Sequence, residues 1–333
     1  PKKPGRPSHS YHSALMANTR LALAVEVLAG NETAPLHNMP GIWAWLDALP
    51  KAARPAVLRG DVAYGNESVL REAEARDQPY LTKLRLTKHV KDLIKKLFRH
   101  TGWADAGQGW EGVEDTLTLT GWSRSRRVVV LRRKLSGEML LTGTDDRQDE
   151  FAFIEGDIPT ARYEYAVLVT STQHEVLTLA QLYRDRADAE NNFDELKNQW
   201  GWGGYTTQDL ARCRLMARMV ALVYNWWNLF VRLAQPHKHF EAITSRPLLL
   251  HGVATQTRHG GQTRLTITST HAKQSVIQAV LTNLAGFLNA LKTTAEQWTD
   301  VQRLRAILER AFTKFMPTTA GPPAWLTAKP DPI

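Results

Sequence analysis

The segment from Arg54 to Leu86 constrains the fold most strongly, because it alternates a strand, a helix and a strand. In "RPAVLRGDVAYGNESVLREAEARDQPYLTKLRL", apolar runs are separated by turn residues. Two strands joined through a helix form a βαβ unit, which indicates an α/β fold. The pattern predicts a strand ending near Asp61, a turn at Gly65-Asn66, a helix over about 67–76 and a strand over 80–86.

A predicted hairpin precedes this unit, with strand-like runs between Ser10 and Asn31 and a turn at 17–20. Its second run, "LALAVEVLAG", is almost continuously apolar, which predicts a strand buried on both faces. A short helix, "PGIWAWLDALP", follows and ends at Pro50. The first hundred residues therefore indicate α/β architecture.

The pattern changes from Gly102 to about Thr172, where short β-branched and aromatic runs are separated by turns. The runs "DTLTLTGW", "RRVVVLRRKL", "FAFIEG" and "YEYAVLVTS" predict an antiparallel β region without a long helix. Helical periodicity returns near Leu177 and continues to Pro236. Beyond it we expect a hairpin turning at Gly260-Gly261, helices near 273–291 and 295–315, and a mobile Pro-rich tail.

The chain is basic, with 42 Lys and Arg against 33 Asp and Glu in 333 residues, a net charge of +9. This balance favours a polyanionic partner such as nucleic acid. The single cysteine, Cys213, excludes an internal disulfide, fits a reducing compartment and is predicted to be a small core residue. No run approaches the roughly 18 apolar residues of a membrane span, and the amino terminus lacks an apolar signal region. We expect a cytoplasmic protein without a membrane partner.

Polar residues form a stripe at helical spacing in "LYRDRADAENNFDELKNQWGW". Tyr183, Arg186, Glu190 and Lys197 lie three, four and seven residues apart, which predicts one helix face. Such a carboxylate can simply pair with the Arg one turn earlier. Asp61, at the carboxyl end of its strand, is either a functional residue or a helix-cap or Asx-turn residue.

An acid flanked by cations suits phosphodiester chemistry. Mg²⁺ prefers carboxylate and water oxygens. Two such ions can activate the attacking oxygen and stabilise the leaving one. Cations beside the acid would hold phosphate oxygens.

On these residues the chain resembles the DDE transposases of bacterial insertion sequences that carry a Tyr-Arg-Glu-Lys signature. The four spacings match, the β region lies before the signature, and Asp61 in "LRGDVAYG" resembles the second acid. The resemblance covers about 2–234. It implies an α/β fold: an RNase H-like core, a mixed sheet with flanking helices, interrupted by an antiparallel β insertion and followed by a mainly helical C-terminal region. The implied parts are 1–101 (core, first part), 102–172 (insertion), 173–235 (core with the signature helix) and 236–333 (hairpin plus helices).

The resemblance also implies roles for individual residues. Asp61 and Glu190 would bind two catalytic Mg²⁺ ions, with Mn²⁺ as a substitute. Tyr183, Arg186 and Lys197 would contact the backbone of double-stranded DNA near the scissile bond. The expected reaction is strand cleavage at transposon ends followed by strand transfer, by a homodimer on DNA in the bacterial, nucleoid-associated cytoplasm.

One departure concerns the first of the family's three acids, which lies on the opening strand of the core. The acids before Asp61 are Glu26, Glu32 and Asp47, and none lies on such a strand. We expect the first acid, its strand and any amino-terminal DNA-binding domain to be absent from this chain. Three hypotheses follow: a fragment of an active transposase, an inactive remnant that binds DNA or a partner chain, and an unrelated basic α/β nucleic-acid-binding protein.

Several further features have two interpretations. Trp122 is a candidate to stack on a DNA base, as an insertion aromatic does in related transposases, or is a half-buried packing residue. The arginines of "WSRSRRVVVLRRK" suit a solvated hairpin or a DNA-backbone contact. The "HGGQTR" turn and the basic start suit flexible loops or DNA contacts. "NWWNLFVRL" predicts core packing of Trp226, Phe230 and Leu233 at helical spacing.

Overall fold

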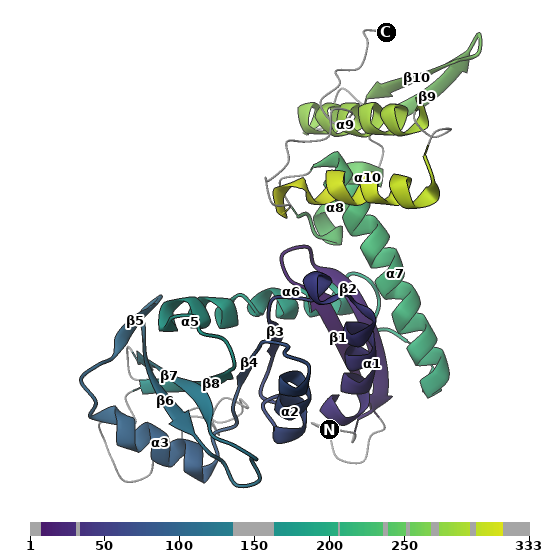
Figure 1. Cartoon of the computed structure of the whole chain (residues 1–333). Coiled ribbons are helices and arrows are strands. Elements are labelled where there is room, and N and C mark those ends of the chain that lie inside the picture. Colours follow the sequence, from purple (N-terminus) through teal and green to yellow (C-terminus); the bar gives the residue numbers. More distant parts are fainter. Residues whose placement is uncertain are drawn as a thin grey trace. The chain divides into compact units, whose positions relative to one another are not determined.

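The computed structural model describes residues 8–30, 34–135, 163–205, 207–235, 239–250, 254–267, 273–293 and 298–315. The chain divides into two compact units (Figure 1). Unit 1 comprises residues 30–187, and unit 2 comprises residues 2–29 with 188–333. The predicted strand "FAFIEG", the basic start, Glu32 and the Pro-rich tail lie outside the described residues.

Unit 1 contains the predicted strand–helix–strand segment. Strand β3 (Leu58–Gly60) lies parallel to β4 (Tyr80–Lys83), and α2 (Glu67–Ala75) connects them. The side chain of Asn66 accepts a hydrogen bond from the Val69 N–H at 3.2 Å, which caps the first turn of α2. The prediction of a βαβ unit is confirmed, with a second strand shorter than expected.

The antiparallel strands predicted after Gly102 continue the same sheet. Strand β4 pairs antiparallel with β8, and the full order is β3-β4-β8-β7-β6-β5. This gives a mixed six-stranded sheet, so the α/β prediction is confirmed at this level. The added strands are β5 (Ala104–Gly107), β6 (Trp110–Leu117), β7 (Arg126–Lys134) and β8 (Tyr163–Thr170).

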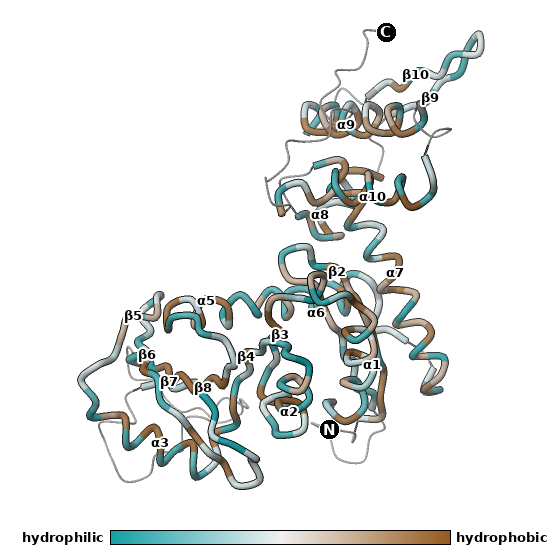
Figure 2. Tube along the Cα trace, in the orientation of Figure 1, coloured by the Kyte–Doolittle hydropathy of each residue, from teal (hydrophilic) through white to brown (hydrophobic). Residues whose placement is uncertain are grey.

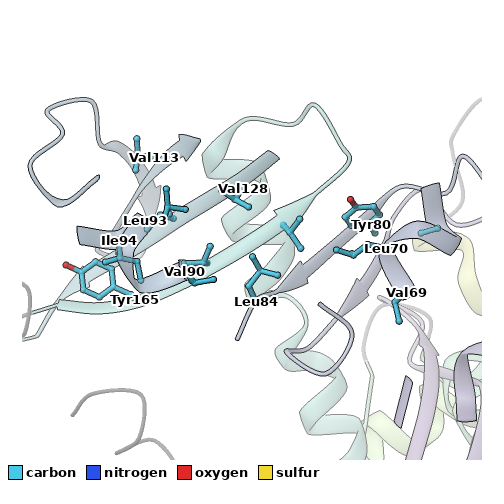
Figure 3. Packing of buried hydrophobic residues seen from close by; sticks show 14 of the residues in the cluster. Val69, Leu70, Tyr80, Leu84, Val90, Leu93, Ile94, Val113, Val128 and Tyr165 are labelled. Atoms are coloured by element: carbon cyan, nitrogen blue, oxygen red, sulfur yellow. The ribbon is translucent and has the colours of Figure 1, made fainter. Parts of the chain in front are cut away.

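Helices cover both faces of this sheet. Alternate residues of β7 point to opposite sides: Val128 and Val130 join the core with helices α1 (Ala34–Ala48), α2 and α3 (Lys88–Phe98), as Figure 3 shows in part. Val129 and Leu131 pack on α5 (Val176–Arg184) on the other side. Each fully buried side chain of this kind contributes roughly 1.5–3 kcal/mol. The two-sided burial makes this sheet a rigid base for the residues at its edges.

Helix α1 begins earlier than "PGIWAWLDALP" predicts and contains Pro40. Helix α3 was not predicted, although its buried residues have helical spacing. A 3-10 turn, η1 (Lys51–Ala53), follows α1.

Unit 2 begins with the predicted hairpin of β1 (His9–Met16) and β2 (Leu21–Ala29), which pair antiparallel around a turn at 17–20. Among the described strands, these two pair only with each other. The prediction that β2 is buried on both faces is wrong, because Leu23 is 40% exposed. The reason is that α7 (Leu210–Ala234) packs beside this two-stranded sheet, which lacks a second covering layer among the described residues of unit 2.

The hairpin turn is held by polar side chains of α7. Asn228 donates to the Thr19 carbonyl at 2.9 Å, and the buried guanidinium of Arg232 donates to the carbonyls of Asn18 and Thr19 at 3.2 Å. Asn18 has a positive φ of 66°. These contacts satisfy backbone carbonyls that would otherwise be buried without partners.

The remainder of unit 2 is mainly helical, as expected. Leu233 packs with Val280, Leu284 and Phe312 in its C-terminal core. Trp226 does not share this burial: it is 61% exposed, so its predicted core position is wrong. The elements are α6 (Ala187–Asn198), α8 (Ala242–Leu250), β9 (Ala254–His259), β10 (Gln262–Ile267), α9 (Gln274–Thr293), α10 (Asp300–Phe312) and η3 (Thr313–Phe315).

The hairpin β9–β10 confirms the turn predicted at Gly260-Gly261. Helix α8 was not predicted. None of the helices described here is long and apolar enough to cross a membrane.

Candidate functional site

The predicted signature helix is broken in two. Helix α5 ends at Arg184 and α6 begins at Ala187, with a turn between them. The Arg186 N–H donates to the Tyr183 carbonyl at 3.1 Å, three residues back rather than four. Tyr183 therefore lies on α5 and Arg186 in the turn. The prediction that all four signature residues share one helix face is wrong.

The unit boundary falls at the first residue of α6. Asp61, Tyr183 and Arg186 belong to unit 1, whereas Glu190 and Lys197 belong to unit 2. The predicted site residues therefore fall into two groups, one in each unit.

In unit 1, Asp61 directly follows β3 and is exposed. Its Oδ1 accepts the Ala63 N–H at 2.9 Å, and its carbonyl accepts the Tyr64 N–H at 3.1 Å. This is the Asx-turn geometry that the sequence left open. It orients the carboxylate at the carboxyl end of a parallel strand, where functional side chains of open α/β sheets gather.

Two glycines allow the chain to fold back after Asp61. A Cβ on Gly60 would lie 2.7 Å from the Cβ of Tyr64, and a Cβ on Gly65 would lie 2.4 Å from the Lys83 carbonyl oxygen. Both distances are too short for a side chain. The acid is thus fixed on a tight turn against β4.

The end of α5 is tied to the strand that precedes Asp61. Arg59, on β3, donates from Nη1 to the Leu182 carbonyl at 2.6 Å. The next residue, Tyr183, has the guanidinium of Arg186 over its ring, 5.4 Å from the centroid. Unit 1 therefore holds Tyr183 and Arg186 as a stacked pair on the helix end bonded to β3.

In unit 2, Glu190 and Lys197 line one pocket of about 690 Å³. Asp194, on the turn of α6 between them, lines it too. All three side chains are exposed, while Asn192, Glu195 and Leu196 form the buried side of the helix. Two acids and an ammonium group thus lie along one wall. The other residues lining the pocket are Ser8, His9, Tyr11, Phe193, Trp202, Gly203, Tyr205, Thr207, Gln208 and Cys213.

Aromatic rings form much of the pocket interior. Tyr11 lies 5.5 Å from the Trp202 ring and 6.1 Å from the Tyr205 ring, and Phe193 packs edge-on against Trp202 at 6.0 Å. Burial, followed by the nearby Tyr11 and Cys213, raises the pKa of Tyr205. Its hydroxyl is buried and has no hydrogen-bond partner among the described residues. A neutral phenol is a donor, so Tyr205 places a buried hydrogen-bond donor beside this pocket.

The pocket aromatics were not predicted as functional. Trp202 is the last residue of the segment quoted for the signature, and Tyr205 follows it in "GWGGY". An aromatic run directly after the signature was the available signal. Cys213, predicted to be a core residue, is 1% exposed, which confirms that prediction.

The buried side of α6 carries a carboxylate, Glu195, that is 1% exposed. Its Oε1 accepts the Ala242 N–H at 3.0 Å and the Trp200 indole N–H at 3.4 Å, and its Oε2 lies 3.2 Å from Nε2 of His239. These bonds attach α6 to the start of α8. Glu195 therefore fixes the helix whose opposite face lines the pocket.

The arginines of the β insertion pair with acids of unit 1, and Arg124 and Arg133 among them are also exposed to solvent, at 60% and 47%. Arg126 is 3% exposed and pairs with Glu67 and Glu74 at 2.5 and 2.7 Å. Arg127 and Arg132 pair with acids of β6 at 2.6 and 2.9 Å. The charges of Arg126, Arg127 and Arg132 are therefore neutralised within unit 1.

Trp122 lies half-buried against the unit 1 core, with the Arg126 guanidinium 4.8 Å from its ring centroid. This is the environment expected of a half-buried packing residue, the second of the two interpretations of Trp122. Stacking on a DNA base remains a prediction for this residue.

The carboxylates fit the chemistry of Mg²⁺, a hard ion that prefers oxygen ligands, keeps several waters and uses one or two carboxylates together with substrate phosphates. Asp61 and Glu190 are exposed, so water and phosphate can reach them. Among the described residues, no group of three or more His, Cys, Asp or Glu side chains could hold a metal ion.

Comparison with known proteins places the chain in a family. Residues 2–226 match the family model described as "Transposase DDE domain". The match covers more than half of the chain, so the protein belongs to the DDE transposase family. No curated protein matches it. Membership implies a transposase-type nuclease, DNA as a partner and the use of divalent metals.

Proposed function

We propose that this protein cleaves DNA strands at the ends of an insertion sequence and joins them to a target, as a member of the Tyr-Arg-Glu-Lys group of DDE transposases with an RNase H-like core. The observation that supports this most is the pocket wall of α6, where Glu190 and Lys197 lie on one exposed face. The spacing of these two residues is that of the signature. An acid and an ammonium group in one pocket suit a phosphodiester.

Each residue has a role set by its chemistry. Asp61 and Glu190 would hold Mg²⁺, or Mn²⁺ in its place. Metal ions held there would supply activation of an oxygen nucleophile and stabilisation of the leaving oxygen. Lys197 and Arg186 would bind phosphate oxygens, because they are cations on exposed or half-exposed positions. Tyr183 would donate a hydrogen bond to the backbone from beneath Arg186. Trp122 is the candidate for base stacking.

The remaining parts of the proposal concern assembly and the first of the family's three acids. A homodimer would hold two transposon ends, in the nucleoid-associated cytoplasm of a bacterium. The first acid of the family would come from outside the described residues.

Nicking assays with the product of the complete reading frame test the proposal. The substrate is DNA that carries the terminal repeats of its own element, with Mg²⁺ present. Glu190→Gln and Asp61→Asn should each abolish nicking and leave DNA binding largely intact, because each change removes a ligand charge at almost constant shape. Asp300→Asn and Asp92→Asn, which neutralise exposed acids of units 2 and 1, are the matched controls and should nick normally.

Full cleavage by either site variant would refute the assignment of that acid. A wild-type protein that binds the ends tightly and never nicks them in Mg²⁺ would favour the alternative, an inactive transposase remnant that only binds DNA or a partner chain.

A further inference from the structure

The hairpin β9–β10 exposes both of its faces. Every side chain from Thr255 to Thr266 is exposed. Within unit 2, β10 contacts α9, and the rest of the hairpin extends beyond that helix (Figure 1). An isolated two-stranded hairpin is marginally stable in water. A hairpin of this kind is therefore expected to be stabilised by a ligand on one of its faces.

The turn gives the hairpin a defined register. Gly260 and Gly261 have φ values of 58° and 79°, and positive φ at both central residues is the requirement of a type I′ turn. His259 then pairs with Gln262, and Thr257 with Arg264. Because directly opposed residues point to the same side of an antiparallel ribbon, the two faces can be assigned from this register.

One face carries only hydrogen-bonding side chains, whereas the other includes an exposed leucine, Leu265, at 55%. Figure 2 shows hydrophilic and neutral colours over most of the hairpin. The polar face consists of Thr255, Thr257, His259, Gln262, Arg264 and Thr266, and the second face includes Gln256, Arg258, Thr263 and Leu265.

The sequence around the hairpin carries charge of one sign. Between Glu241 and Glu296 the sequence contains no Asp or Glu. Arg258 and Arg264 lie on opposite faces of the ribbon and are both exposed. A ribbon that contains two cations and no acid favours a polyanion over a protein of mixed charge.

We propose that the hairpin β9–β10 is a second DNA-binding element that lies in the major groove of duplex DNA, with its polar face toward the base edges. The major groove, about 12 Å wide, admits a two-stranded ribbon. Six residues of a strand span about 20 Å, enough to pass several base pairs. Arg264 matches the acceptor pair of guanine, and Gln262 matches the donor and acceptor of adenine. Arg258, on the other face, would have to reach back along the ribbon edge to contact a phosphate at the rim of the groove.

This proposal rests on the proposed function only in taking DNA as the partner, and it does not depend on Asp61 or Glu190. The hairpin would determine which DNA end is bound, while the acids would cut it. The two roles can therefore be separated by experiment.

The test begins with selection of duplexes with a randomised centre by the full chain. Fluorescence anisotropy then gives affinities for a selected duplex, a scrambled duplex and an RNA duplex of the selected sequence. The variants are Gln262→Ala/Arg264→Ala on the polar face, Arg258→Ala on the other face, and Lys292→Ala on α9. The last change removes one exposed positive charge, as the double variant does, and is the matched control. Thermal unfolding verifies that all variants fold.

The double variant should lose its preference for the selected over the scrambled duplex by roughly 30-fold or more, because it loses two base-specific contacts that are each worth roughly 5- to 150-fold. Lys292→Ala should keep the preference. Arg258→Ala should weaken binding to both duplexes equally and reduce the salt slope by about one phosphate.

A folded double variant with the wild-type preference would overturn the hairpin proposal alone. Tighter binding of the RNA duplex would overturn it as well, because the deep, narrow A-form major groove excludes a ribbon. Wild-type protein that binds no duplex DNA would overturn both this proposal and the proposed function.

Discussion

The ion pairs of Arg126 give a prediction for the stability of unit 1. This guanidinium has a side chain only 1% exposed and lies between Glu67 and Glu74, whose side chains are 24% and 12% exposed. Burial opposes ionisation of Glu67, but hydrogen bonds from Arg126 and Ser123 lower its pKa to about 2. Arg126→Met would remove the cation paired with Glu67 and would leave Glu74 only its ion pair with the exposed Arg124. Removing one partner from a buried pair costs about 3–5 kcal/mol.

The pKa of Glu67 gives an independent magnitude. A fall from 4.5 to about 2 corresponds to roughly 3 kcal/mol, and to less after solvent screening of a partly exposed group. The folded-state pKa is lowered, so this stability is present above the unfolded pKa and is lost as pH falls from about 4.5 towards 2. The difference in unfolding free energy between wild type and Arg126→Met should therefore shrink over that range.

Urea unfolding at pH 7 and at pH 3 provides the assay, with hydrogen exchange of β6, β7 and β8 as the readout for unit 1. Arg124→Met is the matched control: its side chain is 60% exposed and 3.1 Å from Glu74, so at most about 1 kcal/mol should be lost. A loss for Arg126→Met that is as small as that of the control, or that is equal at both pH values, would refute the reasoning.

Two further predictions concern the turn after Asp61 and the pocket wall. Gly65→Ala should destabilise unit 1 by about 1–3 kcal/mol or more, because the new Cβ meets the Lys83 carbonyl oxygen at 2.4 Å. Gly41→Ala, in a helix with open space around it, is the control and should be neutral or stabilising by up to about 1 kcal/mol. Thermal unfolding compares the two variants, and equal effects would contradict the packing described for Gly65. Lys197→Ala should weaken binding to all duplexes and lower the slope of log affinity against log salt by about 0.9, and an unchanged slope would argue against a phosphate contact.

Local patterns predicted much of the fold. The strand–helix–strand segment and the Gly260-Gly261 hairpin were recognisable because turn residues separate their runs. Helix α3 also has a clear apolar periodicity and was predictable. Helix α8 was harder to detect, because Pro247 lies within it.

Tertiary interactions explain what the sequence did not reveal. The break before α6 falls at Asp185 and Arg186, which include neither Pro nor Gly, so the sequence contains no breaker. Apolar residues occur on every side of α7, so their spacing did not show that Trp226 lies on the exposed side. Arg126 and Glu195 are buried through partners distant in sequence, which a local pattern does not reveal.

The proximity of Glu190 and Lys197 was predictable from the sequence, whereas their catalytic roles stay a prediction. Sequence spacing identified Glu190 and Lys197, and the pocket brings this pair together because α6 is a regular helix over that span. Tyr11 lines the pocket because β1 folds near α6 in unit 2. The signature residues alone therefore could not predict its place there.

The most direct test of the central claim asks whether Glu190 binds the catalytic metal. Ligand softness determines metal preference, so a thiolate in place of the carboxylate disfavours Mg²⁺ more than Mn²⁺. Glu190→Cys should lose nicking of terminal-repeat DNA in Mg²⁺ and regain part of it in Mn²⁺. Asp194→Cys, on the same pocket wall, should show no such metal dependence. Equal nicking by Glu190→Cys in both metals would contradict the claim that Glu190 is a metal ligand.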